Sequence, residues 1–223
     1  MSVTKSILDL IQERNLQPGD RLPSERDLAH RWGIGRNALR EALAGLITLR
    51  VLEAKPNSGV YLRRVSTDSS FETLATLAEL GATPSGTEIS ESTEVRLALE
   101  ALVVQLACVR RTEYDLDALN DVQARTESAL REHANIAELD TEFHLALVAA
   151  THNSILVRVL NSFYLLTATR RQAWFENGAQ AKSSSRDHRK IIDAIEQRDT
   201  DAARQLIARH MNRATLYWQE VLG

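Results

Sequence analysis

Asp140 and His144, in the C-terminal half of the chain, have the types and the spacing of a pair of metal ligands. Asp140 and His144 are four residues apart, so on a helix both side chains lie on one face. His188 and His210 belong to two other predicted helices, and in an antiparallel bundle they can converge on the same point. One carboxylate and three imidazoles favour Zn²⁺, with Ni²⁺ or Mn²⁺ as alternatives, and leave one or two coordination positions open.

A fifth residue can extend this site toward a bound acid. Arg96 faces inward on a helix predicted over residues 88–111, and it can hold the far end of a carboxylate ligand through a charge-assisted pair. Ordinary explanations also exist. An isolated Asp-x-x-x-His is usually a surface pair on a helix, and Arg96 and Glu100 are spaced for an i,i+4 salt bridge. Both interpretations of Arg96 stay open at this point.

A second group of residues has the chemistry of DNA recognition. Arg36 and Arg40 are four residues apart near the N-terminus of a helix predicted over residues 36–50, so they project from the same face. Arginine can hold guanine with two hydrogen bonds, and Asn37 can hold adenine in the same way. The ordinary alternative is a solvated helix surface, which is where most arginines lie.

Three further residues can complete this second group. Arg26, on a helix predicted over residues 24–32, is placed for a contact to a phosphate or to the edge of a groove. Ser58 and Gly59 lie at the tip of a predicted hairpin. A small residue there lets the backbone approach the minor groove closely.

The elements that would present these DNA-recognition residues are three helices followed by a hairpin. Ser24 can cap the second helix, with Asp27 three residues further on. After residue 50 the apolar period changes from helix to strand, and residues 56–59 (PNSG) supply a turn. This order predicts a winged helix-turn-helix domain over residues 1–65. The expected elements are helices over residues 2–14, 24–32 and 36–50, and strands over residues 51–55 and 60–64.

From residue 71 onward every periodic segment is helical. We therefore expect a mainly α protein, in which a polar linker at residues 66–70 joins the winged domain to an all-α antiparallel bundle. This bundle, residues 71–223, is expected to bind the effector and to dimerise. The expected helices cover residues 71–80, 88–111, 115–132, 135–151, 154–177, 183–197 and 200–221.

The charge is unevenly distributed along the chain. Residues 1–66 carry eleven Lys and Arg against seven Asp and Glu, whereas the remainder is acidic, and the net charge is −3. A basic head on an acidic body is typical of a DNA-binding domain joined to a domain with another role. The N-terminus has no signal-peptide pattern and Cys108 is the single cysteine, so we expect a cytoplasmic protein that needs no disulfide.

The DNA-recognition residues lie in a longer motif. The run PGDRLPSERDLA at residues 18–29, followed by Arg36 and by REAL at residues 40–43, resembles the DNA-binding domain of the GntR family. That family often has Ser or Thr before the first recognition-helix arginine. Here Gly35 is a weaker cap, and a phosphate contact from the hydroxyl is lost. The resemblance implies DNA contacts at Arg26, Arg36, Asn37, Arg40 and Gly59.

The C-terminal part resembles the FCD domain, the effector domain of the FadR subfamily within the GntR regulators. The motifs that carry this resemblance are EVRLALE at residues 94–100, DTEFH at residues 140–144, Asn153, Asp187-His188 and His210. The resemblance implies that the four predicted ligands bind a metal ion and that a carboxylate effector occupies an open coordination position. Together the two resemblances cover nearly the whole chain.

These observations predict a ligand-responsive transcription regulator rather than an enzyme. We expect a homodimer that binds a palindromic operator, because two helix-turn-helix heads on a two-fold axis read two half-sites. One alternative is a metal-dependent hydrolase fused to a DNA-binding head, but no H-E-x-x-H motif is present and Glu142 projects off the ligand face. Another is a DNA-binding dimer whose helical domain takes no ligand.

Overall fold

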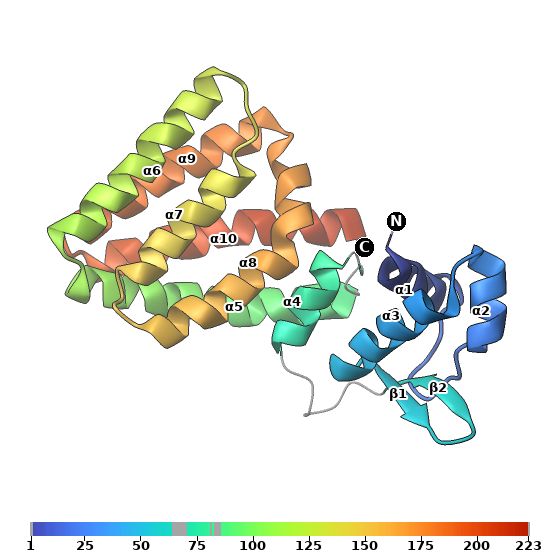
Figure 1. Cartoon of the computed structure of the whole chain (residues 1–223). Helices are drawn as coiled ribbons and strands as arrows, with labels where there is room; N and C mark the ends of the chain where they lie inside the picture. Colours follow the sequence, from blue (N-terminus) through green and yellow to red (C-terminus); the bar gives the residue numbers. More distant parts are fainter. Residues whose placement is uncertain (1, 64–70, 81, 83–85, 223) are drawn as a thin grey trace. The chain divides into compact units, whose positions relative to one another are not determined.

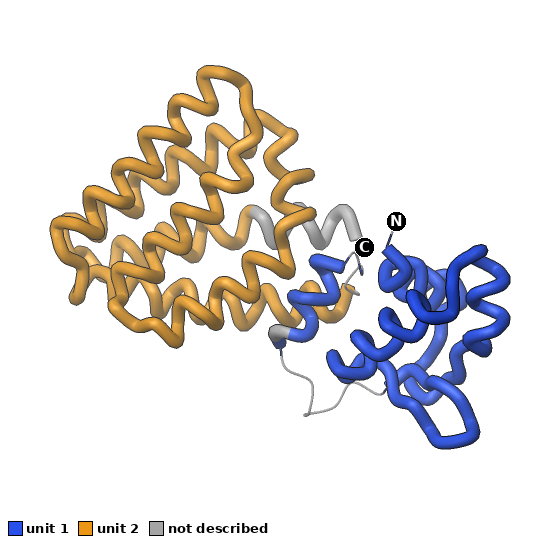
Figure 2. The backbone as a smooth tube through the Cα atoms, in the orientation of Figure 1, with its two compact units in different colours: residues 1–84 blue, residues 85–223 orange. Residues whose placement is uncertain are grey.

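The computed structural model describes residues 2–63, 71–80, 82 and 86–222. The chain divides into two compact units, residues 1–84 and 85–223 (Figure 2). The linker predicted at residues 66–70 lies outside the described residues. The division groups α4 (Phe71–Glu79) with the N-terminal unit, whereas the sequence analysis placed it in the C-terminal domain. Leu77 and Leu80 pack against the N-terminal core, which explains the grouping.

The N-terminal unit contains three helices followed by a two-stranded hairpin. In this hairpin Leu52 lies opposite Leu62 in antiparallel register. The segment before α2 adds to the second strand, since Leu22 N donates to Val60 O at 2.9 Å. The hairpin is therefore the wing that the sequence predicted. The elements are α1 (Val3–Glu13), α2 (Glu25–Trp32), α3 (Arg36–Thr48), β1 (Leu52–Lys55) and β2 (Gly59–Leu62), with α4 after them (Figure 1).

Apolar side chains spaced by about one helical turn pack the N-terminal helices against the wing. This core is continuous from α1 through α3 to β1, so it holds the exposed face of α3 in a fixed position relative to the hairpin. Its most deeply buried members include Ile7, Leu10, Leu39, Leu46 and Leu52.

The described residues of the C-terminal unit form six long helices. Helix α10 packs against α5 and α9, α6 packs against α7 and α9, and α7 packs against α8 (Figure 1). Polar caps begin several of these helices: Thr112 forms a capping box with Asp115, and the Asn153 side chain accepts hydrogen bonds from the first turn of α8. The helices are α5 (Gly86–Arg110), α6 (Glu113–Arg131), α7 (Ala137–Ala149), α8 (Ser154–Phe175), α9 (Gly178–Glu196) and α10 (Thr200–Leu222).

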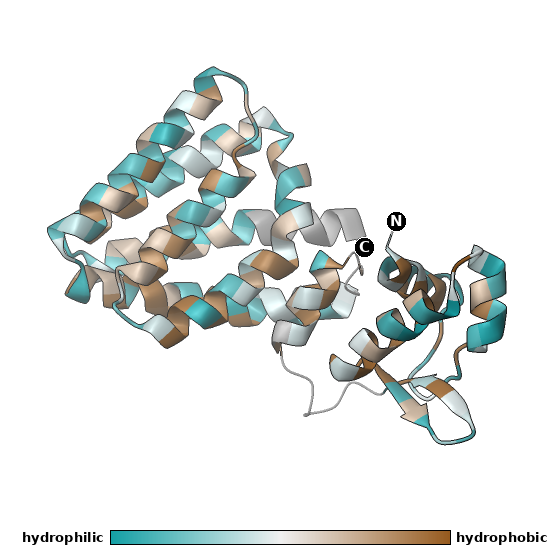
Figure 3. Ribbon diagram, in the orientation of Figure 1, coloured by the Kyte–Doolittle hydropathy of each residue, from teal (hydrophilic) through white to brown (hydrophobic). Residues whose placement is uncertain are grey.

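Hydrophobic and hydrophilic residues alternate along α6 and α9, whose buried residues recur about once per helical turn, as in amphipathic helices (Figure 3). Cys108 lies in the core with Val104, Leu147 and Ile191, all fully buried. The predicted fold class is confirmed: the protein is mainly α, with a winged helix-turn-helix followed by a helical bundle. Across the described residues, none of the helices combines the length and the apolar character needed to cross a membrane.

Candidate nucleic-acid interface and candidate metal centre

Short polar and glycine-containing segments fix where α2 ends and α3 begins. Ser24 caps α2 as predicted, because its Oγ accepts from Asp27 N at 3.2 Å and donates to Asp27 Oδ2 at 2.7 Å. Gly33 ends α2 in the left-handed conformation with a φ of 62°. Gly35 then precedes α3 without a capping side chain. The turn between the helices therefore depends on the left-handed conformation of Gly33, and the N-terminus of α3 has no side-chain cap.

Four arginines surround a pocket of about 320 Å³ beside the N-terminus of α3. Of the predicted DNA-binding residues, three arginines and Gly59 meet here, whereas Asn37 is exposed on α3 outside the pocket lining. The Arg26 side chain is 81% exposed, so the pocket presents its charges to solvent. The arginines that line it are Arg21, Arg26, Arg36 and Arg40.

One of these arginines already has an ionic partner. Arg40 Nε donates to Glu25 Oε2 at 2.8 Å, and this hydrogen bond and the charge of Glu25 raise the pKa of Arg40. The pair is exposed to solvent, and exposed pairs are weak. A negatively charged ligand can therefore compete with Glu25 for the guanidinium group.

The wing approaches this pocket through a backbone conformation that favours glycine. Gly59 has a φ of +130°, and a Cβ atom built on it would lie 2.8 Å from Arg21 Nε. Ser58, the other predicted wing residue, shares a hydrogen bond between its Oγ and the Tyr61 hydroxyl. Glycine at position 59 thus allows the wing and the Arg21 side chain to lie together.

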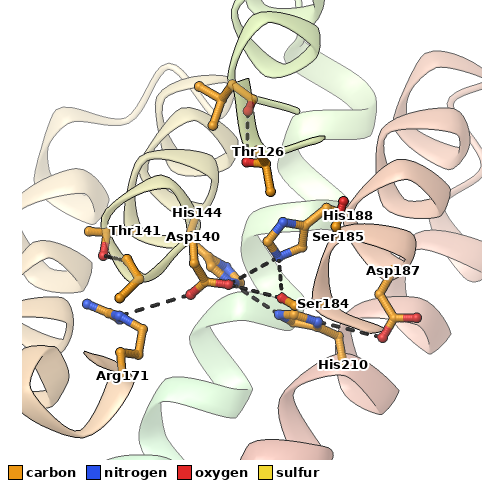
Figure 4. A network of polar contacts seen from close by, with 12 residues as sticks. Thr126, Asp140, Thr141, His144, Arg171, Ser184, Ser185, Asp187, His188 and His210 are labelled. Atoms are coloured by element: carbon orange, nitrogen blue, oxygen red, sulfur yellow. Dashed lines mark hydrogen bonds and ion pairs between the residues drawn. The ribbon is translucent and has the colours of Figure 1, made fainter. Parts of the chain in front are cut away.

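The four predicted metal ligands converge inside the C-terminal unit, and all four are buried. Helix α7 supplies Asp140 and His144, α9 supplies His188, and α10 supplies His210 (Figure 4). One ligand atom from each residue lies within 4.8 Å of the other three. His144 Nε2 is 3.2 Å from His210 Nε2, and His188 Nε2 is 3.4 Å from Asp140 Oδ1. The convergence expected of an antiparallel bundle is therefore present.

This donor set fits a divalent ion. Two ligands bound at about 2.1 Å to one tetrahedral ion lie about 3.4 Å apart, close to the shorter spacings in the cluster. His188 Nδ1 is buried without a hydrogen-bond partner among the described residues, while His188 Nε2 faces Asp140 and Ser184. The Nε2 atoms of His144 and His210 are so close that two protons between them would repel each other. A metal ion bound to the deprotonated nitrogens takes the place of these protons and is attracted to both lone pairs. Asp140, His144, His188 and His210 would hold the ion.

Electrostatics keep the imidazoles of His188 and His210 in the form that binds metals. Burial lowers the pKa of His188 well below its ordinary value, and the charges of His210 and His144 lower it further. The pKa of His210 is also lowered, again mainly by burial. A neutral imidazole has a lone pair for a metal ion, so no proton has to be displaced from these rings at neutral pH.

A buried carboxylate, that of Glu100, contacts the side of the His144 ring that faces away from the other ligands. Glu100 Oε2 lies 3.3 Å from His144 Nδ1, and the Tyr164 hydroxyl donates to Glu100 Oε1 at 2.6 Å. Burial alone raises the pKa of Glu100, but the charge and hydrogen bond of His144, with Arg96 and Tyr164, lower it below its usual range. A carboxylate at Nδ1 orients the ring and leaves Nε2 for the ion.

A cavity of about 80 Å³ opens beside the four-residue cluster. Arg96 lines it and also pairs with Glu100 at 3.3 Å, so the two interpretations of Arg96 are compatible. Arg171 Nε lies 4.0 Å from Asp140 Oδ2, and Figure 4 shows this side chain aimed at that carboxylate. Burial lowers the pKa of Arg171 to about 10. The cavity therefore joins a metal-ligand set to a cationic wall.

Several residues of these two sites escaped the sequence analysis. Arg21 was not predicted, although its position beside the turn PGD before α2 could have suggested proximity to the wing. Arg170 and Arg171 were also missed, because two consecutive arginines near the end of a helix usually face solvent. Only the packing of α8 against α7 and α9 shows that both line the cavity.

Comparison with known families finds a match in each half of the chain. Residues 2–62 match bacterial regulatory proteins of the gntR family, and residues 91–213 match the FCD domain. The chain is 33% identical to an Escherichia coli (strain K12) protein provisionally named the L-lactate dehydrogenase operon regulatory protein, over 94% of this chain and 82% of that protein. It is 30% identical to the HTH-type transcriptional regulator LutR of Bacillus subtilis (strain 168), over 83% and 85%.

Other relatives and solved structures agree. The HTH-type transcriptional repressor NanR of Cronobacter sakazakii is 27% identical over 97% of this chain and 84% of its own length. Among solved structures, Streptococcus agalactiae GntR aligns with a TM-score of 0.51 at 26% identity, covering 95% of this chain and 96% of that one. E. coli McbR/YncC aligns with a TM-score of 0.58 at 19% identity over the full length of both chains, which supports the fold.

Proposed function

Because the chain belongs to the GntR family of bacterial transcription regulators and carries an FCD domain, we propose that it is a dimeric regulator controlled by a metal ion and a carboxylate effector. The observation that carries this proposal is the buried cluster of three histidines and Asp140, which opens onto an arginine-lined cavity. The family binds DNA and small-molecule effectors, and the relatives are regulators rather than enzymes. The proposal adds which groups in this chain do so.

DNA recognition is assigned to the pocket beside α3 and to the wing. Arg36 and Arg40 read base edges in the major groove, because they project from the N-terminal part of the recognition helix. Asn37 is exposed beside them and reads a neighbouring base. Arg26 contacts a phosphate, while Ser58 and Gly59 bring the wing to the minor groove.

Dimerisation is supported by an apolar stripe on the C-terminal unit. Val95, Leu102 and Val109 are seven residues apart on α5, and they are 52%, 42% and 71% exposed. Ile155 and Val159 add exposed apolar surface on α8, which packs against α5. Such a stripe on a soluble domain favours burial against a second copy. Two heads related by a two-fold axis then bind a palindromic operator.

The effector response is assigned to the cavity beside the cluster. When bound, a divalent ion, Zn²⁺ in the first instance, supplies positive charge that attracts a carboxylate. Arg96 orients the acid from α5, and Glu100 holds both Arg96 and His144 in place. An effector with different affinity for two conformations of the dimer shifts their populations and thereby changes operator affinity.

The enzymatic alternative has no supporting observation. Glu142, the nearest acidic residue on the same helix, is paired with Arg125 at 2.7 Å on the exposed side of α7. A regulator whose helical domain takes no ligand is the remaining alternative. It predicts purified protein with substoichiometric metal and operator binding that chelators and acids do not change.

The test uses the full-length dimer and a labelled fragment of the DNA upstream of its own operon. Fluorescence anisotropy measures operator affinity with bound Zn²⁺, after chelation, and with a panel of small carboxylic acids, while sedimentation gives the oligomeric state. We expect one metal ion per chain, a dimer, and at least one acid that changes operator affinity about fivefold or more. Tight DNA binding that is insensitive to every acid and to metal removal would exclude the sensor role.

A further inference from the structure

The guanidinium group of Arg170 has no counter-charge among the described residues. Arg170 lies on α8 and lines the cavity beside the metal-ligand cluster. Both terminal nitrogens of its guanidinium group are buried, and neither has a hydrogen-bond partner among the described residues. Burial lowers the pKa of Arg170, and the charge of Arg96 lowers it further. A guanidinium group in this situation lacks the anion that normally accompanies a buried charge.

The other arginines of the cavity are already engaged. Arg96 pairs with Glu100, and Arg213 pairs with Asp187. Arg171 donates to Tyr164 O at 2.9 Å and to Thr167 Oγ1 at 3.2 Å. These bonds leave Arg170 as the arginine on this wall with both terminal nitrogens available, within the part of the chain that the structure describes.

The balance of charge in the cavity points the same way. Its described lining includes four arginines but one carboxylate, Asp140, which belongs to the metal-ligand set. Glu100 and Asp187 neutralise Arg96 and Arg213 from outside the lining. Arg171 lies against Asp140, Arg170 has no hydrogen-bond partner for its terminal nitrogens among the described residues, and a bound divalent ion would add two positive charges. A ligand with one negative charge leaves this site strongly cationic, whereas a second negative charge reduces the excess.

We infer that the effector is a small dianion, a short-chain dicarboxylate, with one carboxylate at the metal centre and the other held by Arg170. This inference rests on the proposed effector role of the cavity and specifies the class of effector. The cavity volume of about 80 Å³ corresponds to roughly five to eight water-sized positions, which suits an acid of three or four carbons. A guanidinium group binds a carboxylate through two parallel hydrogen bonds, which Arg170 has free to give.

The experiment compares two four-carbon acids on the Zn²⁺-loaded full-length protein. Isothermal titration calorimetry measures the affinity of succinate and of butyrate for the wild type, Arg170→Met and Arg170→Lys, with metal content checked after each titration. Arg158→Met, at an exposed position of the same helix, is the matched control. We expect succinate to bind about tenfold to a hundredfold tighter than butyrate, as a charge-assisted pair implies. Arg170→Met removes this preference, Arg170→Lys keeps most of it, and Arg158→Met leaves it unchanged.

Thermal unfolding of the ligand-free protein provides an independent readout. Removing an unpaired buried charge leaves the melting temperature of Arg170→Met equal to or above that of the wild type, while succinate no longer raises it. A clear loss of stability in Arg170→Met would mean that Arg170 has a structural partner, and this would overturn the inference.

The measured affinities distinguish failure of the dianion inference from failure of the proposed effector role. Butyrate binding as tightly as succinate, or an unchanged preference in Arg170→Met, would overturn the dianion inference and leave the effector site itself intact. Binding of neither acid would also overturn the dianion inference. The wider effector role then fails only if the whole acid panel leaves operator affinity unchanged.

Discussion

The arginines of the two candidate sites, one in each unit of this protein, have opposite surroundings. In the N-terminal unit the side chains of Arg26 and Arg40 are 81% and 67% exposed, and the ionic partners of both lie at the surface. In the C-terminal unit those of Arg96 and Arg171 are 11% exposed and face Tyr164 and the carboxylates of Glu100 and Asp140. Exposed charges attract any polyanion and are screened by salt, whereas buried charges are screened little and discriminate among ligands by shape and charge.

This difference shows how arginine can serve both DNA binding and the binding of a small ligand. The exposed set can search along a phosphate backbone through many weak contacts, and its sequence preference comes from the few groups that reach base edges. The buried set makes few contacts with one small ligand, and each contact decides whether that ligand binds. Variants that remove charge should therefore affect the two units in different ways.

The largest effect is expected on the exposed set. Replacing Arg36 and Arg40 together with alanine should weaken operator binding by roughly a thousandfold, because two bidentate base contacts are lost. Fluorescence anisotropy over a range of salt concentrations measures both the affinity and its salt dependence. Arg158→Ala, an exposed arginine of α8, is the control and should change neither. An unaltered sequence preference in the double variant would contradict the assignment of α3 as the reading helix.

Removal of a metal ligand should give the next largest effect, confined to the buried set. His144→Ala is expected to lower Zn²⁺ affinity by more than about a hundredfold. Removing a residue that only hydrogen-bonds to a metal ligand already lowers metal affinity by about tenfold to a hundredfold, and removing the ligand itself should cost more. Chelation should destabilise the wild type by about 4 kcal/mol if metal is present at a thousand times its Kd.

Calorimetry with and without a chelator measures this effect, and His30→Ala is the control, because His30 is exposed on α2. The assignment of the metal site to the C-terminal unit would be contradicted if chelation destabilised the N-terminal unit alone. It would also be contradicted if His144→Ala bound Zn²⁺ as tightly as the wild type.

The smallest effect concerns two glycines of the N-terminal unit. Gly59→Ala should destabilise the protein by about 1–2 kcal/mol, because φ is +130° and the new Cβ would meet Arg21 Nε at 2.8 Å. Gly45→Ala, inside α3 with open space around it, should instead stabilise the protein by about 0.5–1 kcal/mol. Urea unfolding measures both variants. Equal effects of the same sign would show that the wing does not depend on the conformation of Gly59.

Much of the fold followed from local patterns. The period of apolar residues predicted the helices to within about two residues at most of their ends, although α9 begins at Gly178 and not at the predicted residue 183. The turn PNSG predicted the wing. The spacing of Asp140 and His144 placed two ligands on one face of α7 because helical geometry alone determines that relation. The resemblance to the FCD domain then added His188 and His210, which lie on other helices.

The cationic side of the cavity could not be predicted in this way. Whether Arg170 faces solvent or the cavity depends on how α8 is rotated against its neighbours, and helical period does not distinguish a buried arginine from an exposed one. Glu100 was recognised as a partner of Arg96, but its contact with His144 joins residues 44 positions apart. Arg21 was missed for a similar reason, since its proximity to Gly59 arises from pairing between distant segments.

Gly35 has a consequence for how the recognition helix behaves before it meets DNA. The first backbone amides of α3 have no hydroxyl to satisfy them, so this turn should open more readily than a capped one. Amide hydrogens at residues 36–38 should exchange quickly with deuterated solvent in the free protein and slow down once an operator phosphate accepts them. Folding of the first turn is then part of the binding reaction, and the entropy lost there makes the association more dependent on temperature.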